Sequence, residues 1–299
     1  MRAPPQKDMA MNSWQVWLNL SLNTLALASL LAMLTVGLTL IFGIMRIMNF
    51  AHGALYMFGA YAGISAARFF DSFWIGLIAA PLVAGAVGSV FELLLMRHLY
   101  RRDGSSFLLI TFGWALALSE LTRLIWGSNT RDVPIPEAFN NVLFIAGEPF
   151  PLYRAFLIVF GFSVLGLLIV VLLKSRLGLL IRSISQNPEM THALGVDVGV
   201  IRSLTFAVGC AFAGLGGYLA VPLITGYIGM GSAAIIDSFV IVMIGGMGSF
   251  IGSAVGSILV AATQTFGNFY IPDFALVLTY VLMICVLVYR PGGLFGEEE

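Results

Sequence analysis

Long stretches without a charged residue limit the folds that this chain can adopt. Residues 9–45, 203–236 and 238–272 contain no Asp, Glu, Lys or Arg. A helix needs about 20 consecutive apolar residues to cross a bilayer, and each of these tracts is longer than that. Only 10% of the 299 residues are charged, whereas soluble domains carry roughly 25%. The sequence therefore predicts an integral membrane protein.

The charged residues divide the chain into about eight apolar segments of span length. The strict alternation of apolar and polar residues that a membrane β-barrel requires is absent, so each span is predicted to be a helix. Each of the three longest uncharged tracts is expected to hold a span plus an irregular or re-entrant piece. We predict an all-α, polytopic membrane helix bundle with broken Gly-rich segments, forming one domain over 1–299. The predicted spans lie near 16–43, 52–70, 74–97, 106–126, 153–173, 203–223, 238–267 and 273–290.

Basic residues indicate which loops face the cytoplasm. One loop after the third predicted span carries three arginines: Arg97, Arg101 and Arg102. A second loop, over about 174–202, is bracketed by four basic residues: Lys174, Arg176, Arg182 and Arg202. Two spans separate these loops, so both are predicted to be cytoplasmic, and the loop of mixed charge over about 127–152 is predicted to lie outside. The chain is expected to be a multi-pass protein of the bacterial cytoplasmic (inner) membrane with an uncleaved first span, and the side of each terminus stays open.

Two segments are candidates for a translocation pathway. The first, "MRIMNFAHGALYMFGAYAG", places Asn49, His52 and Gly53 in apolar sequence, and polar groups at membrane depth usually face a cavity or a partner. The second, "MIGGMGSFIGSAVGS", interrupts an apolar tract with small residues: Gly245, Gly246, Gly248, Ser249 and Gly252. A structural alternative stays open for each, because such glycines also allow close helix packing. Asn49 could cap a helix, and His52 could bond to a backbone carbonyl.

The remaining polar and sulfur-containing residues favour structural roles. Glu120 and Arg123 have the spacing of an ion pair on one helix face, Glu92 is expected at the cytoplasmic boundary, and Asp237 is expected at a helix N-terminus. The cysteines lie in apolar runs and are predicted to be small core residues: Cys210 and Cys285. The histidines are scattered over different segments, so neither a metal site nor an enzyme is expected: His52, His98 and His192.

The polar segment "SISQNPEMTHALGVDVG" predicts a short cytoplasmic helix. Asn187 suits the N-cap, Pro188 and Glu189 suit the first turn, and Gly195 suits the C-terminal stop. Three apolar residues would then share one face: Met190, Ala193 and Leu194. A helix of about two turns is not stable alone. It therefore needs a surface to dock against, whether the membrane, its own bundle or a soluble partner.

Four motifs in order resemble the permease subunits of ABC importers for branched-chain amino acids. They are "MNFAHGALYMFGAY", "QNPEMTHALGVDVGVIRSLTF", "GGMGSFIGSAVGS" and "RPGGLFG". The resemblance covers about 25–296 and is greater to the first of the two related permeases of such systems. It implies that the short helix sits in a groove of an ATP-binding subunit. Thr191 and His192 stand where small residues are common in the family.

The resemblance also implies the partners. These would be a second related permease, two ATP-binding subunits that hydrolyse the ATP, and an extracytoplasmic solute-binding protein. The sequence itself contains no Gly-x-x-x-x-Gly-Lys-Ser/Thr phosphate loop, so no cofactor is expected in this chain. Nothing in its zero net charge suggests nucleic-acid binding.

Other functions stay open at this point. Urea and short-amide importers use closely related permeases, and an apolar pathway suits an aliphatic amino acid or urea about equally. A stand-alone, ion-coupled secondary transporter would place ionisable groups along its pathway. A membrane enzyme would need clustered His, Asp or Glu residues, which the sequence does not supply.

Overall fold

The protein is a helical bundle in a computed structural model, which describes residues 13–99 and 104–296. Arg101 and Arg102 of the predicted cytoplasmic loop lie outside the described residues. The longer helices are α1 (Ser13–Met45), α2 (Ala51–Phe69), α3 (Phe73–Leu94), α4 (Gly104–Trp126), α5 (Leu152–Lys174), α8 (Val198–Ile224), α9 (Met230–Gly245), α10 (Phe250–Tyr270) and α11 (Ala275–Tyr289). The shorter elements are α6 (Arg176–Gln186), α7 (Pro188–Ala193), the single turns η1 (Met96–Leu99), η2 (Glu137–Phe139) and η3 (Pro272–Phe274), and strands β1 (Val142–Ile145) and β2 (Glu148–Pro151).

The helical, polytopic fold class is confirmed, and the count of eight spans is approximate. Within the described residues, 7 helices are long and apolar enough to cross a membrane. Helix α2 matches the predicted span 52–70 but is not among those seven, and α9 has only 16 residues. The protein is a multi-pass membrane protein.

The expectations about the longest uncharged tracts have different outcomes. The first tract forms one continuous helix, α1, over the described residues 13–45, which contradicts the irregular piece expected there. The irregular piece expected in 238–272 is confirmed as a break at 246–249, but this break divides the predicted span 238–267 between α9 and α10, so that single span is wrong. Gly246 and Gly248 have φ values of 101° and 87°, which glycine adopts without steric cost. The glycines therefore end one helix and start another, instead of kinking a single span.

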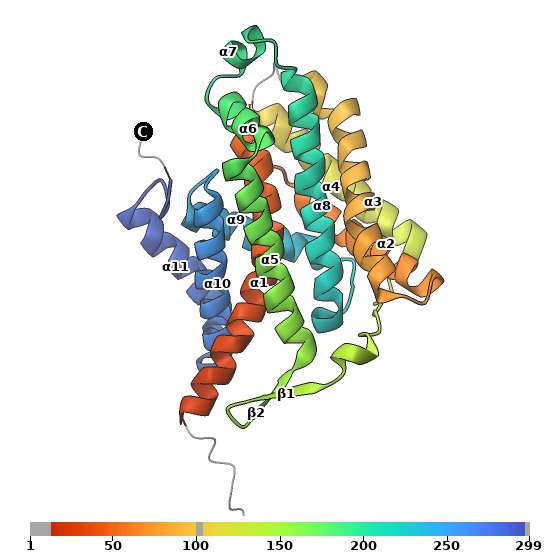
Figure 1. The fold of residues 1–299 in the computed structure, drawn as a ribbon, viewed down its shortest axis with the longest axis vertical. Helices are drawn as coiled ribbons and strands as arrows, with labels where there is room; N and C mark the ends of the chain where they lie inside the picture. The colour runs from red at the N-terminus through yellow and green to blue at the C-terminus, as the bar shows by residue number, and fades with distance from the viewer. Residues whose placement is uncertain (1–12, 100–103, 297–299) are drawn as a thin grey trace, which may run out of the picture.

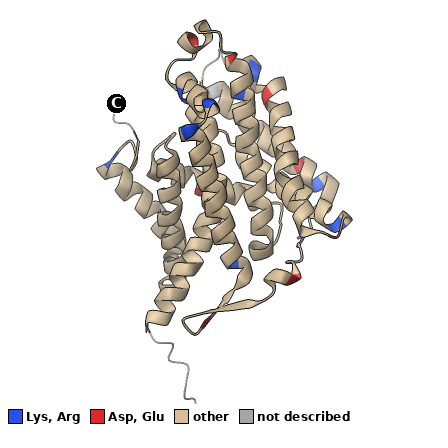
Figure 2. Ribbon diagram, in the orientation of Figure 1, with Lys and Arg blue, Asp and Glu red and all other residues tan. Residues whose placement is uncertain are grey.

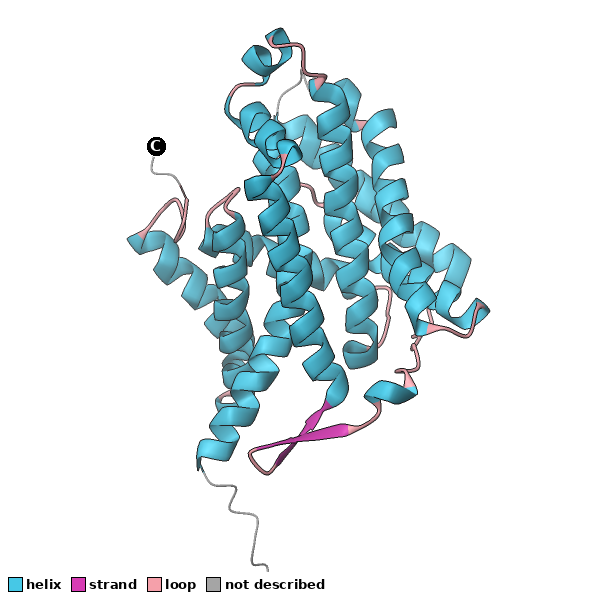
Figure 3. Ribbon diagram, viewed as in Figure 1, coloured by secondary structure: helices cyan, strands magenta, loops and turns pink. Residues whose placement is uncertain are grey.

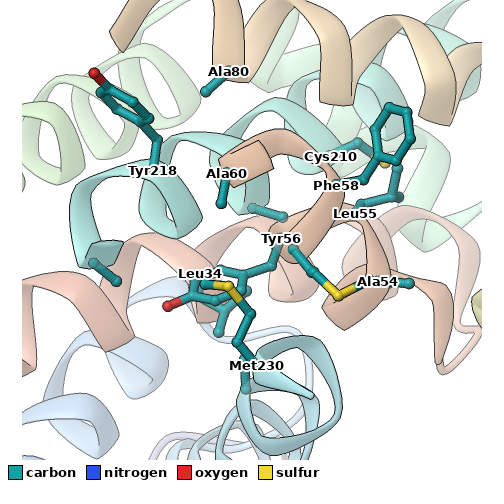
Figure 4. Close-up of a cluster of buried hydrophobic side chains, with 14 of the residues drawn as sticks. Leu34, Ala54, Leu55, Tyr56, Phe58, Ala60, Ala80, Cys210, Tyr218 and Met230 are labelled. Atoms are coloured by element: carbon teal, nitrogen blue, oxygen red, sulfur yellow. The ribbon is translucent and has the colours of Figure 1, made fainter. Parts of the chain in front are cut away.

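The core lies where α8 packs along α1, α2 and α3. Small residues bring these helices close together: a Cβ on Gly59 of α2 would overlap Gly214 of α8, and one on Gly217 would overlap the Tyr56 carbonyl. Figure 4 shows side chains of this cluster, which include Leu34, Tyr56 and Met230. The two cysteines differ in burial. Cys210 is buried in this core, as predicted, whereas Cys285 on α11 is exposed, contrary to the prediction.

The two ends of the bundle differ in structure and charge. Helices α6 and α7 lie at one end, and the antiparallel hairpin β1–β2 lies at the other, within the predicted outer loop (Figures 1 and 3). Several Lys and Arg residues gather toward the α6–α7 end (Figure 2), which the positive-inside rule assigns to the cytoplasm. Helix α1 begins at the hairpin end, whereas α11 ends toward the opposite side (Figure 1). The first and last helices therefore place the ends of the described chain on opposite faces.

Candidate functional site

The short cytoplasmic helix forms as α7, with the predicted start and stop. The Asn187 Oδ1 atom accepts a hydrogen bond of 2.9 Å from the Met190 amide, and Pro188 and Glu189 occupy the first turn. The helix ends before Gly195, which adopts a left-handed conformation with a φ of 86°. Such a residue commonly follows the C-terminus of a helix. The local sequence signals are therefore sufficient to define α7.

The apolar face of α7 points away from the bundle. The Met190 side chain is 60% exposed and that of Leu194 is 78% exposed, and Ala193 beside them is also exposed. On the inner side, Thr191 is buried, and its hydroxyl donates a hydrogen bond of 2.8 Å to the Asn187 carbonyl. The apolar residues that the sequence placed on one face of this helix are therefore exposed to the outside of the bundle.

Helix α6 joins α7 to the end of α1, and the sequence interpretation missed it. Ser175 caps α6 by accepting a hydrogen bond of 3.1 Å from the Gly178 amide, and Ile184 is buried. The Ser185 hydroxyl donates a bond of 2.5 Å to the Gly43 carbonyl near the end of α1. The N-cap serine and the apolar residues at helical spacing are the sequence signals that could have identified α6. Helix α6 therefore contacts both α7 and α1.

The predicted pathway residues of the first segment form a buried packing junction. The Asn49 Oδ1 atom accepts a bond of 3.1 Å from the Ala51 amide at the start of α2. The His52 Nε2 atom lies 2.9 Å from the Leu34 carbonyl of α1, and Gly53 packs directly on Gly231 of α9. Asn49 and His52 are fully buried. The His52 contact matches its structural alternative. The alternative for Asn49 is matched only in part, because the N-cap of α2 is Phe50 and Asn49, one residue earlier, bonds to the first amide of the helix.

Replacing His52 with alanine is expected to destabilise the bundle. The substitution removes the hydrogen bond that joins α2 to α1 and leaves a buried gap, so we expect a loss of about 2 kcal/mol in the free energy of unfolding. Unfolding monitored by size-exclusion chromatography after heating in detergent measures the change. An unchanged midpoint, combined with altered transport, would contradict the packing role.

The glycines of the second segment hold α9 against α10 and the C-terminal residues. A Cβ on Gly252 of α10 would overlap the Gly245 carbonyl of α9. The Ser249 hydroxyl caps α10 by accepting a bond of 3.0 Å from the Gly252 amide. The amides of Leu294 and Phe295 donate bonds of 2.9 and 3.0 Å to the carbonyls at the end of α9. The C-terminal motif "RPGGLFG" therefore packs against Gly246, at the break in the helix that the residues "GGMGS" form.

Methionine side chains from the two predicted pathway segments line one small pocket. Met48 precedes Asn49, and Met247 lies within the break after α9. Both line a small pocket whose surface is wholly apolar: Leu38, Phe42, Met48, Phe239, Val242, Met243 and Met247. Neither Asn49 nor His52 reaches this pocket. The structure therefore brings the flanks of the two segments together between α1 and α9.

Three of the charge predictions have different outcomes. Glu120 and Arg123 form the predicted pair at 2.7 Å. Glu92 is buried and accepts a hydrogen bond of 2.5 Å from the Ser203 hydroxyl of α8. The placement of Asp237 at a helix N-terminus is wrong, because α9 begins seven residues earlier, at Met230. Its carboxylate instead lies in the middle of α9, where it accepts a bond of 3.2 Å from Gln264 of α10.

Comparison with known proteins places this architecture among transport permeases. Residues 20–287 match the family described as "Branched-chain amino acid transport system / permease component". The chain is 28% identical to the high-affinity branched-chain amino acid transport permease LivH of Salmonella typhimurium, with 93% of this chain and 94% of the relative covered. It is 30% identical to the high-affinity branched-chain amino acid transport permease BraD of Pseudomonas aeruginosa, with 93% of this chain and 95% of the relative covered.

The chain is also similar to a second type of permease. It is 26% identical to the probable permease LivM of Methanocaldococcus jannaschii, over 75% of this chain and 68% of the relative. No solved structure matches the chain.

Proposed function

Because the chain belongs to the family of branched-chain amino acid transport permeases, we propose that it is the membrane-spanning permease subunit of an ABC importer for branched-chain, aliphatic amino acids. The family is one of transport proteins and not of enzymes. The observation that carries the proposal is α7, a capped helix at the cytoplasmic end whose Met190 and Leu194 side chains are exposed. Such a helix suits the groove of a soluble subunit that hydrolyses ATP, which this chain does not itself do.

Four further subunits complete the proposed importer. They are a second related permease, two ATP-binding subunits and an extracytoplasmic solute-binding protein. The similarity of this chain to permeases named LivH and LivM supports a pathway built from two related permeases. No nucleic acid takes part.

Coupling in this importer runs from α7 to the centre of the bundle. Closure of the ATP-binding subunits displaces α7, which acts through α6 and the Ser185–Gly43 hydrogen bond on the end of α1. Gly43 lies beside Gly248 in the break between α9 and α10. The same movement therefore reaches the apolar pocket where Met48 and Met247 meet. We propose that the two predicted pathway segments, one polar and one rich in glycine, shape the pathway by positioning α1, α2 and α9 around it.

Co-purification tests the proposed assembly. The tagged chain is extracted gently from its native membrane, and the proteins bound to it are identified by mass spectrometry. Recovery of ATP-binding subunits and a second permease supports the proposal. Recovery of the chain alone, or only with copies of itself, would contradict it and favour gradient-driven transport.

A further inference from the structure

Asp237 is a carboxylate in the middle of an apolar helix. It lies in the 16-residue α9, between segments rich in Ile, Val and Phe. An ionisable side chain at membrane depth is costly, and it usually faces a partner group or a water-filled pathway. Glu120, by contrast, is paired with Arg123 on its own helix. Asp237 is therefore the described acidic residue whose position within a span most needs a functional explanation.

A polar side chain of another helix bonds to this carboxylate. Gln264 of α10 donates a bond of 3.2 Å to Asp237 Oδ1. Helix α2 also packs against α9, and Figure 4 shows Tyr56 of α2 beside Met230, the first residue of α9. Asp237 and Gln264 therefore form a polar contact between α9 and α10, and α2 packs against the same helix α9.

One side of the Asp237–Gln264 pair is open, because both side chains are only partly buried. Within the described part of the chain, the single hydrogen bond to the Asp237 carboxylate comes from Gln264, and no Lys, Arg or His forms an ion pair with it. A carboxylate with this surrounding retains acceptor capacity for a positively charged nitrogen. A lipid-facing position would leave that charge without a partner.

We propose that the Asp237 carboxylate binds the α-ammonium group of an amino acid as it passes through the pathway. The bond from Gln264 fixes the orientation of the carboxylate. This inference rests on the proposed function and adds to it a residue that selects the substrate. An amino acid carries the required ammonium group, whereas urea is uncharged, so Asp237 favours the amino acid.

The test compares Asp237→Asn with the unaltered importer in proteoliposomes. The asparagine oxygen can still accept the bond from Gln264, so the contact between α9 and α10 is kept while the charge is removed. We expect leucine uptake per ATP hydrolysed to fall by about tenfold or more, as the loss of a charge-assisted bond predicts. Radiolabelled leucine and urea are supplied separately with the solute-binding protein, and ATP hydrolysis is measured in parallel.

Thr263→Val is the matched control, because the Thr263 hydroxyl donates a bond to the Leu259 carbonyl within its own helix, α10. This variant is expected to transport normally.

Leucine uptake by Asp237→Asn at the unaltered rate would overturn the inference. Loss of the other subunits when Asp237→Asn is purified would also overturn it, since Asp237 would then bind a partner chain. Uptake of urea alone by the unaltered importer would overturn it as well. If the unaltered importer transports neither compound with ATP, the proposed function itself fails.

Discussion

Replacing both Met190 and Leu194 with aspartate is expected to reduce ATP-driven uptake by about 100-fold or more. Both side chains are exposed on α7, so the change leaves the bundle intact. Against an apolar groove, however, two carboxylates lose their water without gaining a partner, which costs several kcal/mol. Uptake of labelled leucine by cells that express the complete importer measures the effect, and the amount of the chain in the membrane is measured by immunoblotting.

A control for this double variant lies on the same side of the membrane. Tyr289 at the end of α11 is also highly exposed, and α11 ends well away from α7 in Figure 1. Tyr289→Asp adds a charge without touching the proposed docking surface and should retain uptake. Unaltered uptake by the Met190→Asp/Leu194→Asp variant would show that α7 does not couple the permease to its energy source.

Replacing Gly252 with valine is expected to prevent the stable association of α9 and α10. A side chain at this position would overlap the backbone of Gly245, which cannot move aside as a flexible side chain would. Overpacking of this kind costs about 1–3 kcal/mol, and more where the neighbour is backbone. The fraction of protein that remains monodisperse on size-exclusion chromatography after heating measures the loss.

Gly166 of α5 provides the matched control, because no atom lies within 4 Å of the Cβ it would gain. Gly166→Ala is expected to keep or raise stability, since alanine favours a helix by about 1 kcal/mol over glycine. If Gly252→Val were as stable as Gly166→Ala but defective in transport, the segment would act in the pathway and not in packing.

Local signals explain what the sequence predicted well. The N-cap Asn187, the proline after it and Gly195 define α7 without reference to the rest of the chain. Apolar length likewise located most spans. Helix α6 was missed because the positive charges of Arg176 and Arg182 favoured the interpretation of its segment as a loop. The hairpin β1–β2 was missed because its short strands lie in a segment rich in Pro and Asn.

Tertiary contacts explain what the sequence could not settle. The glycines after α9 were recognised as weakening a helix, yet the full break depends on the left-handed φ at Gly246 and on the C-terminal residues that bond there. The role of His52 depended on the position of the Leu34 carbonyl, which lies on another helix. Asp237 was placed at a helix start because charge alone does not reveal that α9 begins at Met230.

The most direct test of the central claim is leucine uptake by the purified importer in proteoliposomes. This chain is reconstituted with the subunits that co-purify with it, ATP is enclosed with the ATP-binding subunits, and the solute-binding protein is supplied on the opposite side with labelled leucine. The account predicts accumulation of leucine that requires ATP hydrolysis and persists when ion gradients are abolished by ionophores. Accumulation that ignores ATP and disappears with the ion gradient would contradict it.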